Sequence, residues 1–502
     1  MSSHSDSTPA SSRLMSLPLE IFGRILHALD APNPLFVPIY GRENETLCNY
    51  GNLDTQHVKY YGPDRTAEQE LASHAVLNWS STCSYYRRLL APHLLHDLVL
   101  RTRPKSVDSV AALANTSHWS QVKALTVCTT FLLEKERDDG FESPFEDLDL
   151  EHIERVLSNL PPNLESLTVD LPWDWYNDLD GEDHEPFEIP EEGDFAHVFY
   201  TIFHSLGQNE ISKKGRFTFN VLNIPGAHFL GPDGRDATTE DGFHNFLSHV
   251  TTFKLTLPYV DNGAGWQMSV YRSDSDNFTA ALGSQFIDKL ADVTSLTLEA
   301  NYSCPIGSNR DWHAIAFPMP TEDARFPKLK TLTFDHFWVD TDLLGFIGTH
   351  SPNIEHLTLL NCAADQAASS PGVESGESWA YFFNILPKNA KSLKSLTLKQ
   401  TQSEDSLIDS YSEDNQMQQS PQVKEAFTQV LNPIAQRDEG DEEVWRRRKR
   451  MLPYMVLDDK YGFLNMDDEG TAARFLEGAD HEALLKLWKA LEDRGGEGVI
   501  FL

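Results

Sequence analysis

The sequence predicts an α/β protein in which an N-terminal all-α module is followed by an irregular array of strand-helix repeats. Two observations carry this prediction. In the first hundred residues, apolar residues recur at steps of three and four, which is typical of one face of a helix. From residue 120 onward the apolar period falls to two, and one short apolar phrase recurs along the chain. A chain of 502 residues with 40% hydrophobic content is long and apolar enough for several folded domains.

The N-terminal module is predicted to span residues 14–100, after a Ser-rich tail at residues 1–13. Pro18 suits the first turn of a helix, because its fixed φ is helical and its missing N–H is not needed there. Residues 31–66 are rich in Pro, Gly and Asn and lack a period, so we expect a long inserted loop. The helix before this loop carries a wide apolar stripe, which consists of Leu19, Ile21, Phe22, Ile25, Leu26 and Leu29.

A second helical run follows the loop and ends at Pro92, where proline stops the pattern. We expect two or three short helices there. Its apolar positions, again at steps of three and four, are Val76, Trp79, Cys83, Tyr86 and Leu89.

Together the two helical runs resemble the F-box family. The first matches through Leu17-Pro18-x-Glu20-Ile21, and the second through the phrase VLNWSSTCSYYRRLLAPHLLHDLVL. The resemblance implies that both runs pack on the Skp adaptor subunit of a cullin-RING ubiquitin ligase. The residues implied in this contact are Leu17, Pro18, Ile21, Ile25, Leu26, Leu29, Val76, Trp79, Cys83, Tyr86 and Leu89.

The chain departs from the family pattern in two ways. Thr82 and Tyr85 stand where an apolar and a basic residue are usual. The insertion of about forty residues replaces a connection of about ten, although longer loops add little closure entropy. An alternative therefore stays open, in which the chain is a repeat scaffold without ligase association.

Residues 101–400 are predicted to form the repeats. The recurring phrase is apolar, two residues, apolar, one residue, apolar, and it predicts a strand whose apolar residues face a core. Its eight instances are Val122-Leu125-Val127, Leu164-Leu167-Val169, Phe219-Leu222-Ile224, Val250-Phe253-Leu255, Val293-Leu296-Leu298, Leu329-Leu332-Phe334, Ile354-Leu357-Leu359 and Leu393-Leu396-Leu398.

Amphipathic helix-sized stretches lie between several phrases, so strand and helix alternate. One such unit cannot bury its apolar face alone and has to stack on its neighbours. The array resembles a leucine-rich-repeat solenoid, but its spacing is wider and less even than the roughly 20 to 29 residues of regular repeats. We therefore expect a degenerate array. Residues 401–502 are predicted to hold a polar linker and C-terminal helices, including an amphipathic helix near residues 480–493.

An F-box module followed by such repeats is similar to fungal F-box proteins, whose repeats recruit a target for ubiquitin transfer and protein degradation. Residues between the apolar positions should project outward, and in six instances they are threonines, for which β-propensity alone is a sufficient reason. The next outward position holds Asp170, Glu299 and Asp335. Their acidity hints at a basic protein target.

Composition limits the other functions. The net charge of −35 argues against binding to nucleic acid. No apolar run is long enough to span a bilayer, and the five scattered cysteines predict neither disulfides nor a zinc site. We found no nucleophile, phosphate-binding or metal-binding motif, so we expect no enzyme activity and no cofactor. The expected location is the cytoplasm, the nucleus or both, and the basic run at residues 446–450 is compatible with nuclear import.

Overall fold

The computed structural model describes residues 91, 94–102, 104–129, 150–171, 194–209, 216–224, 236–257, 282–300, 306–307, 317–365, 378–399, 420–435, 449–457 and 464–501. The chain divides into two compact units. The smaller takes in the described part of Met1–Leu100 with Ala112–Thr126 and Pro161–Leu164. The larger takes in Arg101–Ala111, Val127–Leu160 and Glu165–Leu502.

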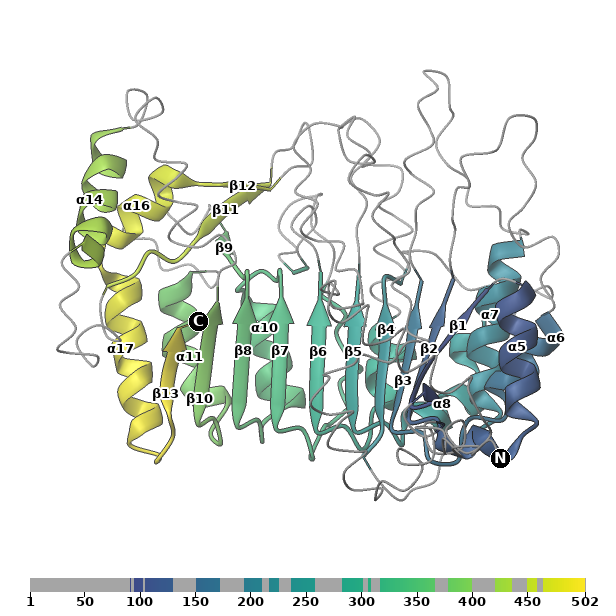
Figure 1. Ribbon diagram of the computed structural model, residues 1–502. Coiled ribbons are helices and arrows are strands. Elements are labelled where there is room, and N and C mark those ends of the chain that lie inside the picture. Colours follow the sequence, from purple (N-terminus) through teal and green to yellow (C-terminus); the bar gives the residue numbers. More distant parts are fainter. Residues whose placement is uncertain are drawn as a thin grey trace, which may run out of the picture. The chain divides into compact units, whose positions relative to one another are not determined.

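The predicted α/β class is confirmed, with ten strands in one sheet (Figure 1). The strand order is β1-β2-β3-β4-β5-β6-β7-β8-β10-β13, so neighbours in the sheet follow one another along the chain. Within this sheet, all pairings from β3 to β13 are parallel. The strands are β1 (Asp97–Arg101), β2 (Ala124–Cys128), β3 (Ser166–Asp170), β4 (Thr218–Leu222), β5 (Thr252–Thr256), β6 (Ser295–Glu299), β7 (Thr331–Asp335), β8 (His356–Leu360), β10 (Ser395–Lys399) and β13 (Gly498–Phe501).

Helices follow most of these strands and pack on the sheet. They are α5 (Pro104–Ala114), α6 (Leu150–Leu157), α7 (Asp194–Gly207), α8 (Asp241–Leu247), α10 (Thr341–Gly345), α11 (Trp379–Asn389), α14 (Pro421–Ala435), α16 (Asp468–Glu477) and α17 (Ala479–Glu492). Short 3-10 turns lie at η3 (Ser117–Gln121), η5 (Ala237–Thr239) and η6 (Ile287–Lys289), and α10 continues into a π-helical turn, η7 (Phe346–His350). None of the helices in the described ranges has the length and apolar character that a membrane span requires.

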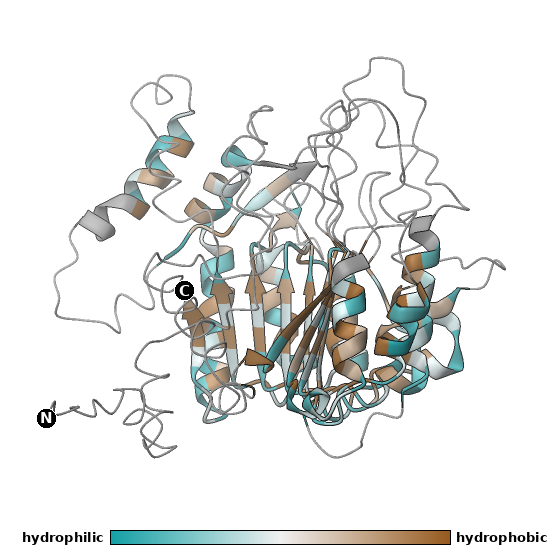
Figure 2. Cartoon of the chain, turned by 45° about the vertical axis from the view of Figure 1, so that its right-hand side comes forward, coloured by the Kyte–Doolittle hydropathy of each residue, from teal (hydrophilic) through white to brown (hydrophobic). Residues whose placement is uncertain are grey.

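Seven of the eight phrases lie on strands in the expected frame. On β8, for example, Leu357 and Leu359 are buried while Thr358 between them is partly exposed. Figure 2 shows the same alternation of apolar and polar residues along the sheet. Each strand therefore turns its apolar side chains toward the helices, as the period of two predicts.

The frame predicted at Phe219 is wrong. The register pairs Leu167 with Phe219 and Val169 with Val221, so Phe219 and Val221 are the core positions of β4. The predicted frame relied on Ile224 as a core residue of the strand. Ile224 is buried, but it lies after β4 has ended at Leu222.

The prediction omitted the two outermost strands, β1 and β13. Strand β1 carries the phrase at Leu95-Leu98-Leu100, but it lies at the end of the range predicted as an all-α module, so residues 97–100 form a strand where helices were expected. Strand β13 begins at Gly498 and lacks the first apolar residue of the phrase. Val499 pairs with Leu396 of β10, which extends the sheet into the segment for which only helices were expected.

Helix α11 also differs from expectation, because it continues past Pro387 to Asn389. Proline removes one intrahelical N–H, yet the last turn is closed by the bond from Ala390 N to Leu386 O. The Arg494 guanidinium also donates to the carbonyl oxygens of Pro387 (2.8 Å) and Ala390 (3.0 Å). These bonds stabilise the last turn of α11, which the sequence pattern predicted to end before Pro387.

Phenylalanines fill much of the core behind β4 to β7. Phe203, Phe243 and Phe286 contact one another edge to face, with ring centroids 5.3 to 6.0 Å apart. The approach of α7 to α8 depends on Gly207 and Gly242, because a Cβ on Gly242 would lie 2.6 Å from Gly207 O. Consecutive helices are thus held close enough to cover a continuous face of the sheet.

The described residues between β10 and α17 add a small lobe, which consists of residues 420–435, 449–457 and 464–477. Helices α14 and α16 share an apolar core of Val423, Ala426, Phe427, Val430, Ala472 and Phe475. A second sheet joins β9 (Ala364–Asp365), β11 (Tyr454–Leu457) and β12 (Leu464–Met466). Because β9 directly follows β8, this sheet connects the lobe to the ten-stranded sheet.

Candidate functional site

The candidate binding surface is the face of the sheet that points away from the helices, across β3 to β10. We call it the outer sheet face. Figure 1 shows α10 and α11 behind the strands, on the opposite side. Its first row is Ser166, Thr218, Thr252, Ser295, Thr331, His356 and Ser395, and its second row is Thr168, Asn220, Lys254, Thr297, Thr333, Thr358 and Thr397.

Hydroxyl groups dominate both rows. In the second row, Thr297, Thr333, Thr358 and Thr397 occupy matched positions on four neighbouring strands. All four are partly exposed, as the sequence predicted for threonines between core positions. In the first row, His356 Nδ1 lies 2.8 Å from Ser395 Oγ. Ser395 is buried, so this contact closes the β10 end of the first row.

One ion pair lies in this face. Lys254 Nζ is 2.6 Å from Glu299 Oε2, and the side chains are 25% and 17% exposed. Next to it, Asn220 Nδ2 donates to Thr168 Oγ1 at 3.0 Å. Lysine is depleted in strands, so β-propensity, which accounts for the threonines, does not account for Lys254.

The acidic face expected from Asp170 and Asp335 is not formed. Both carboxylates are buried, and each accepts a hydrogen bond of 2.8 Å, from Asn223 and Asn361 respectively. Each asparagine lies directly after the next strand, with φ of 56° and 50°. Such a left-handed backbone is tolerated best by Gly and Asn, so the two pairs are a repeated way of ending a strand. Glu299, the third acid, pairs with Lys254.

Burial raises the pKa of one of these acids, Asp170. Removal from water raises the pKa of Asp170 from 3.8 to about 6, although the Asn223 hydrogen bond opposes the change. The carboxyl group is therefore partly protonated in mildly acidic solution.

Three charged residues lie along the border of the outer sheet face, at the positions just before β7, β8 and β10. Lys330 Nζ lies 2.8 Å from Glu355 Oε1, and Lys394 Nζ donates to Glu355 Oε2. Hydrogen bonds from Lys330 and then Lys394 lower the pKa of Glu355 to about 2. This row is internally paired and offers no uncompensated carboxylate.

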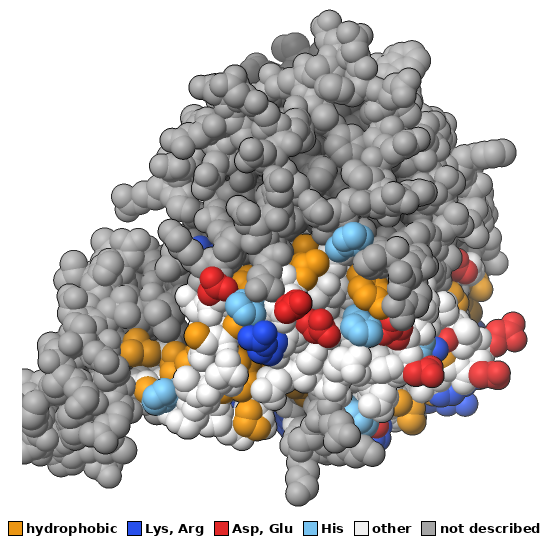
Figure 3. Space-filling view, turned by 90° about the vertical axis from the view of Figure 1, so that its right-hand side faces the viewer, with side chains coloured by type: hydrophobic (Ala, Val, Ile, Leu, Met, Phe, Trp, Pro, Cys, Tyr) orange, Lys and Arg blue, Asp and Glu red, His pale blue; other side chains and the backbone are white. Residues whose placement is uncertain are grey.

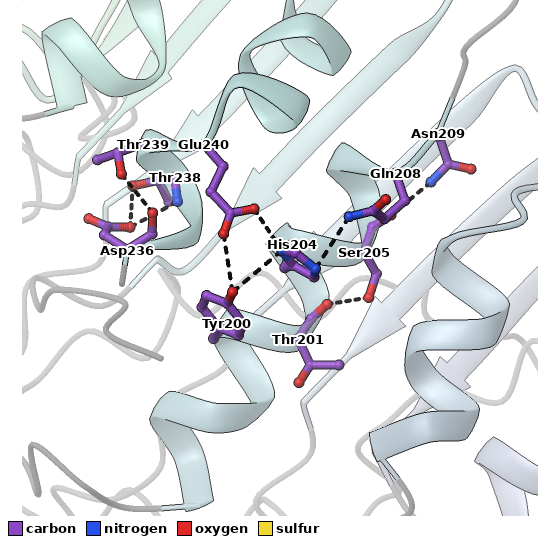
Figure 4. A network of polar contacts seen from close by, with 10 residues as sticks. All are labelled: Tyr200, Thr201, His204, Ser205, Gln208, Asn209, Asp236, Thr238, Thr239 and Glu240. Atoms are coloured by element: carbon purple, nitrogen blue, oxygen red, sulfur yellow. Dashed lines mark hydrogen bonds and ion pairs between the residues drawn. The ribbon is translucent and has the colours of Figure 1, made fainter. Parts of the chain in front are cut away.

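The helical side of the molecule carries a separate polar cluster, shown in Figure 4. His204 Nδ1 lies 2.6 Å from Glu240 Oε2, and the Tyr200 hydroxyl donates to Glu240 Oε1 at 3.1 Å. Close by, Asp236 accepts from Thr238 N at 2.8 Å. The cluster connects α7 with the turn before α8, and its acceptors are occupied by its own donors. Figure 3 shows the end of the molecule that lies on the right in Figure 1, where the described surface has acidic and histidine side chains but few lysines or arginines. We assign the cluster a structural role.

A buried polar cluster also holds the C-terminal lobe in place. Asp480 Oδ1 accepts from Ala380 N at 2.9 Å, and Asp480 Oδ2 accepts from the Tyr454 hydroxyl at 3.0 Å. Arg474 Nη2 lies 3.6 Å from Asp480 Oδ1. Trp379 Nε1 donates to Pro453 O at 2.9 Å. Every group points to another part of the same chain, so this cluster is an internal connection rather than a ligand site.

Two residues of the basic run at 446–450 are described, and both take part in packing. Lys449 Nζ lies 4.5 Å from the centroid of the Phe475 ring, and burial lowers its pKa. The Arg450 guanidinium lies 4.0 Å from the centroid of the Phe501 ring. Binding of this run to an import receptor would therefore require Lys449 and Arg450 to leave these ring contacts.

The residues predicted to bind the Skp adaptor lie outside the described ranges. They are Leu17, Pro18, Ile21, Ile25, Leu26, Leu29, Val76, Trp79, Cys83, Tyr86 and Leu89. Their assignment stays a prediction from sequence. In the described ranges, no group of three or more His, Cys, Asp or Glu side chains is arranged to hold a metal ion.

Comparison with models of known protein families found no match, and comparison with curated proteins found none either. The assignment of a function therefore depends on the residues themselves. Sequence patterns located the threonines of the outer sheet face, but they did not single out the Lys254–Glu299 pair. The sequence feature that could have indicated this pair is Lys254 itself, a lysine at the position where six other strands carry Thr or Asn.

Proposed function

We propose that the chain is the substrate-recognition subunit of a Skp-cullin-F-box ubiquitin ligase. Residues 17–29 and 76–90 bind the Skp adaptor, and the outer sheet face binds the protein to be ubiquitinated. In this proposal the chain catalyses no reaction itself and needs no cofactor. It acts in the cytoplasm, the nucleus or both.

The strand order is the observation that supports the repeat half of this proposal. Each strand from β3 to β7 pairs with the strand before it and the strand after it in the chain. Stacked repeats have this arrangement, because each unit buries its apolar face only against its sequence neighbours. Solenoids of this type bind partners through an extended strand face, which here is the outer sheet face.

The segment 354–362 adds support for a leucine-rich-repeat solenoid. It reads Ile354-x-x-Leu357-x-Leu359-x-x-Cys362, which fits the repeat phrase that ends in Asn or Cys. The Cys362 thiol is buried, 3.3 Å from Leu360 O of its own strand and 3.7 Å from Phe334 O of the preceding strand. This residue therefore packs against the strand before it, as the stacking of repeats requires.

The adaptor half is supported by the F-box resemblance of the first hundred residues. Its critical feature is a helix whose apolar stripe is wide enough to serve both an internal core and a partner. Ile25 lies in that stripe, whereas His27 lies on the polar side.

The test is capture of the purified Skp adaptor by the full chain, with Ile25→Lys and the matched variant His27→Lys. An apolar anchor contributes more than about 1 kcal/mol, and a charge at that site adds a desolvation penalty, so Ile25→Lys should weaken binding by well over tenfold. His27→Lys adds the same charge on the polar face and should bind normally. Thermal melts show whether Ile25→Lys remains folded. A folded wild-type chain without measurable adaptor affinity would refute the ligase assignment.

The alternative is a repeat scaffold without ligase association. The long insertion at residues 31–66 favours it, because that segment separates the two halves of the predicted adaptor-binding module. The same capture experiment distinguishes the two functions.

A further inference from the structure

The C-terminal ends of β2 to β5 are joined by a series of hydrogen bonds in which Asp170 is central. Thr129 N, just after β2, donates to Asp170 O at 3.0 Å. Asp170 Oδ1 accepts from Asn223 Nδ2, just after β4, at 2.8 Å. Asn223 N in turn donates to Oγ1 of Thr256, the last residue of β5, at 2.6 Å. We call these four residues the strand-end chain.

One member of the strand-end chain can ionise in mildly acidic solution, and it is buried. Asp170 is 5% exposed, and the other three members are uncharged. Its register partner on β4 is Leu222, and β2 ends at Cys128, which is also buried. No cation in the described ranges offsets the carboxylate, so burial opposes its charge and the Asn223 bond is what favours it.

The other strand-end pair, Asp335 with Asn361, has a further group beside its carboxylate. Asp335 is also buried, and it accepts from Asn361 Nδ2 at 2.8 Å. His336 Nδ1 lies 2.8 Å from Asp335 Oδ1, so a protonated His336 can balance the charge. Asp170 is followed by Leu171, which cannot do so. The two pairs therefore share a geometry but differ in how the charge of the acid is compensated.

The effect of ionising Asp170 has a defined direction. While the strand ends are closed, the carboxylate is held away from water, which disfavours its charged form. When they open, water solvates the charge, so deprotonation favours the open state. Asn223 bonds to both Asp170 and Thr256, and the ends of β3, β4 and β5 are therefore expected to open together.

We propose that Asp170 makes the strand-end chain sensitive to pH, so that the ends of β3 to β5 are held closed in mildly acidic solution and open more often at neutral pH. The opening is local and precedes unfolding of the rest of the sheet. This inference is independent of the proposed function, because it concerns the bonds between strand ends and not the binding of the Skp adaptor or a target.

Hydrogen exchange of the full chain between about pH 4 and about pH 7.5 tests the proposal. The amides of Asn223 and Ile224 report on the opening, because both donate to Thr256. After correction for intrinsic exchange rates, their opening equilibrium should rise by about fiftyfold, as expected for an acid whose pKa is about 6 when closed and 3.8 when open. Asp170→Asn keeps the acceptor without the charge, so its opening should not change with pH.

Asp335→Asn is the matched control, because it neutralises a buried acid of the same strand-end geometry on β7. It should leave the pH dependence at Asn223 unchanged, and thermal melts show whether each variant is folded. A wild-type opening that does not vary with pH, or a variation that persists in Asp170→Asn, would overturn the proposal. So would exchange at Asn223 as slow as that of the most protected amides, since the segment would then open only with the whole molecule.

Discussion

Leu357 and Thr358 are adjacent residues of β8 with opposite surroundings. Leu357 is fully buried between the sheet and the helices, whereas Thr358 is partly exposed on the outer sheet face. Leu357→Ala should lower the free energy of unfolding by roughly 2 to 5 kcal/mol, because it removes buried methyl groups and leaves a cavity. Thr358→Ala should lower it by under about 1 kcal/mol. Denaturant titrations measure both, and equal losses would contradict a half-buried strand.

Asp170 should make stability depend on pH. Its folded pKa, about 6, is higher than in the unfolded chain, so its favourable contribution is complete below about pH 4 and disappears as the pH rises through 6. Asp170→Asn keeps the acceptor for Asn223 but does not ionise. Relative to wild type, the variant should therefore gain about 2 to 3 kcal/mol of stability between pH 4 and pH 7.

The comparison of unfolding free energies at several pH values tests this expectation, and Asp292→Asn is the control. Asp292 is 45% exposed and pairs with Lys328 on the surface. Its replacement should give a difference from wild type that changes little with pH. Parallel curves for wild type and Asp170→Asn would show that the Asp170 carboxyl is ionised throughout this range.

At the scale of single elements, two helical glycines are predicted to respond oppositely to the same change. A Cβ on Gly242 of α8 would lie 2.6 Å from Gly207 O, whereas a Cβ on Gly345 of α10 meets nothing within 4 Å. Gly242→Ala should force α7 and α8 apart and lower the melting temperature. Gly345→Ala should be neutral or stabilising by up to about 1 kcal/mol, since alanine favours helix. Thermal melts of the two variants decide this, and similar losses in both would argue against the close approach.

Strands with two alternating core residues could be predicted from sequence, because burial of one face imposes a period of two. Phe253 and Leu255 of β5 show this clearly. The frame of β4 was predicted wrongly because Ile224 is buried for another reason, as part of the connection after the strand. Strand β13 was not predicted, because its pairing with β10 depends on a partner far away in the chain.

The candidate site was predictable only in part, for a related reason. That Thr333 and Thr358 lie on one face follows from alternation along each strand. That Asp170 does not join them depends on Asn223, which comes from the next strand and bonds to it across the sheet. Contacts of this kind are fixed by the stacking of strands, which a single segment of sequence does not contain.

At the scale of the whole molecule, the insertion at residues 31–66 should be dispensable. It is rich in Pro, Gly and Asn, and longer loops add closure entropy only slowly, so replacing it with a short linker should leave folding intact. The shortened chain should express in soluble form, and under the proposed function it should capture the Skp adaptor with the same affinity as the full chain. Loss of soluble expression would show that the segment belongs to the core of the N-terminal module.

The pairing of β10 with β13 also sets an order of events during folding. Residues 400–497 lie between these two strands, while the other strands from β3 onward pair with partners that follow sooner in the chain. Closing a longer loop is slower and costs more chain entropy. We expect the repeats up to β10 to assemble first, and the lobe and α17 to bring β13 into place later. During that interval β10 is an unpaired edge, and this is when the molecule is most exposed to mispairing with a second copy.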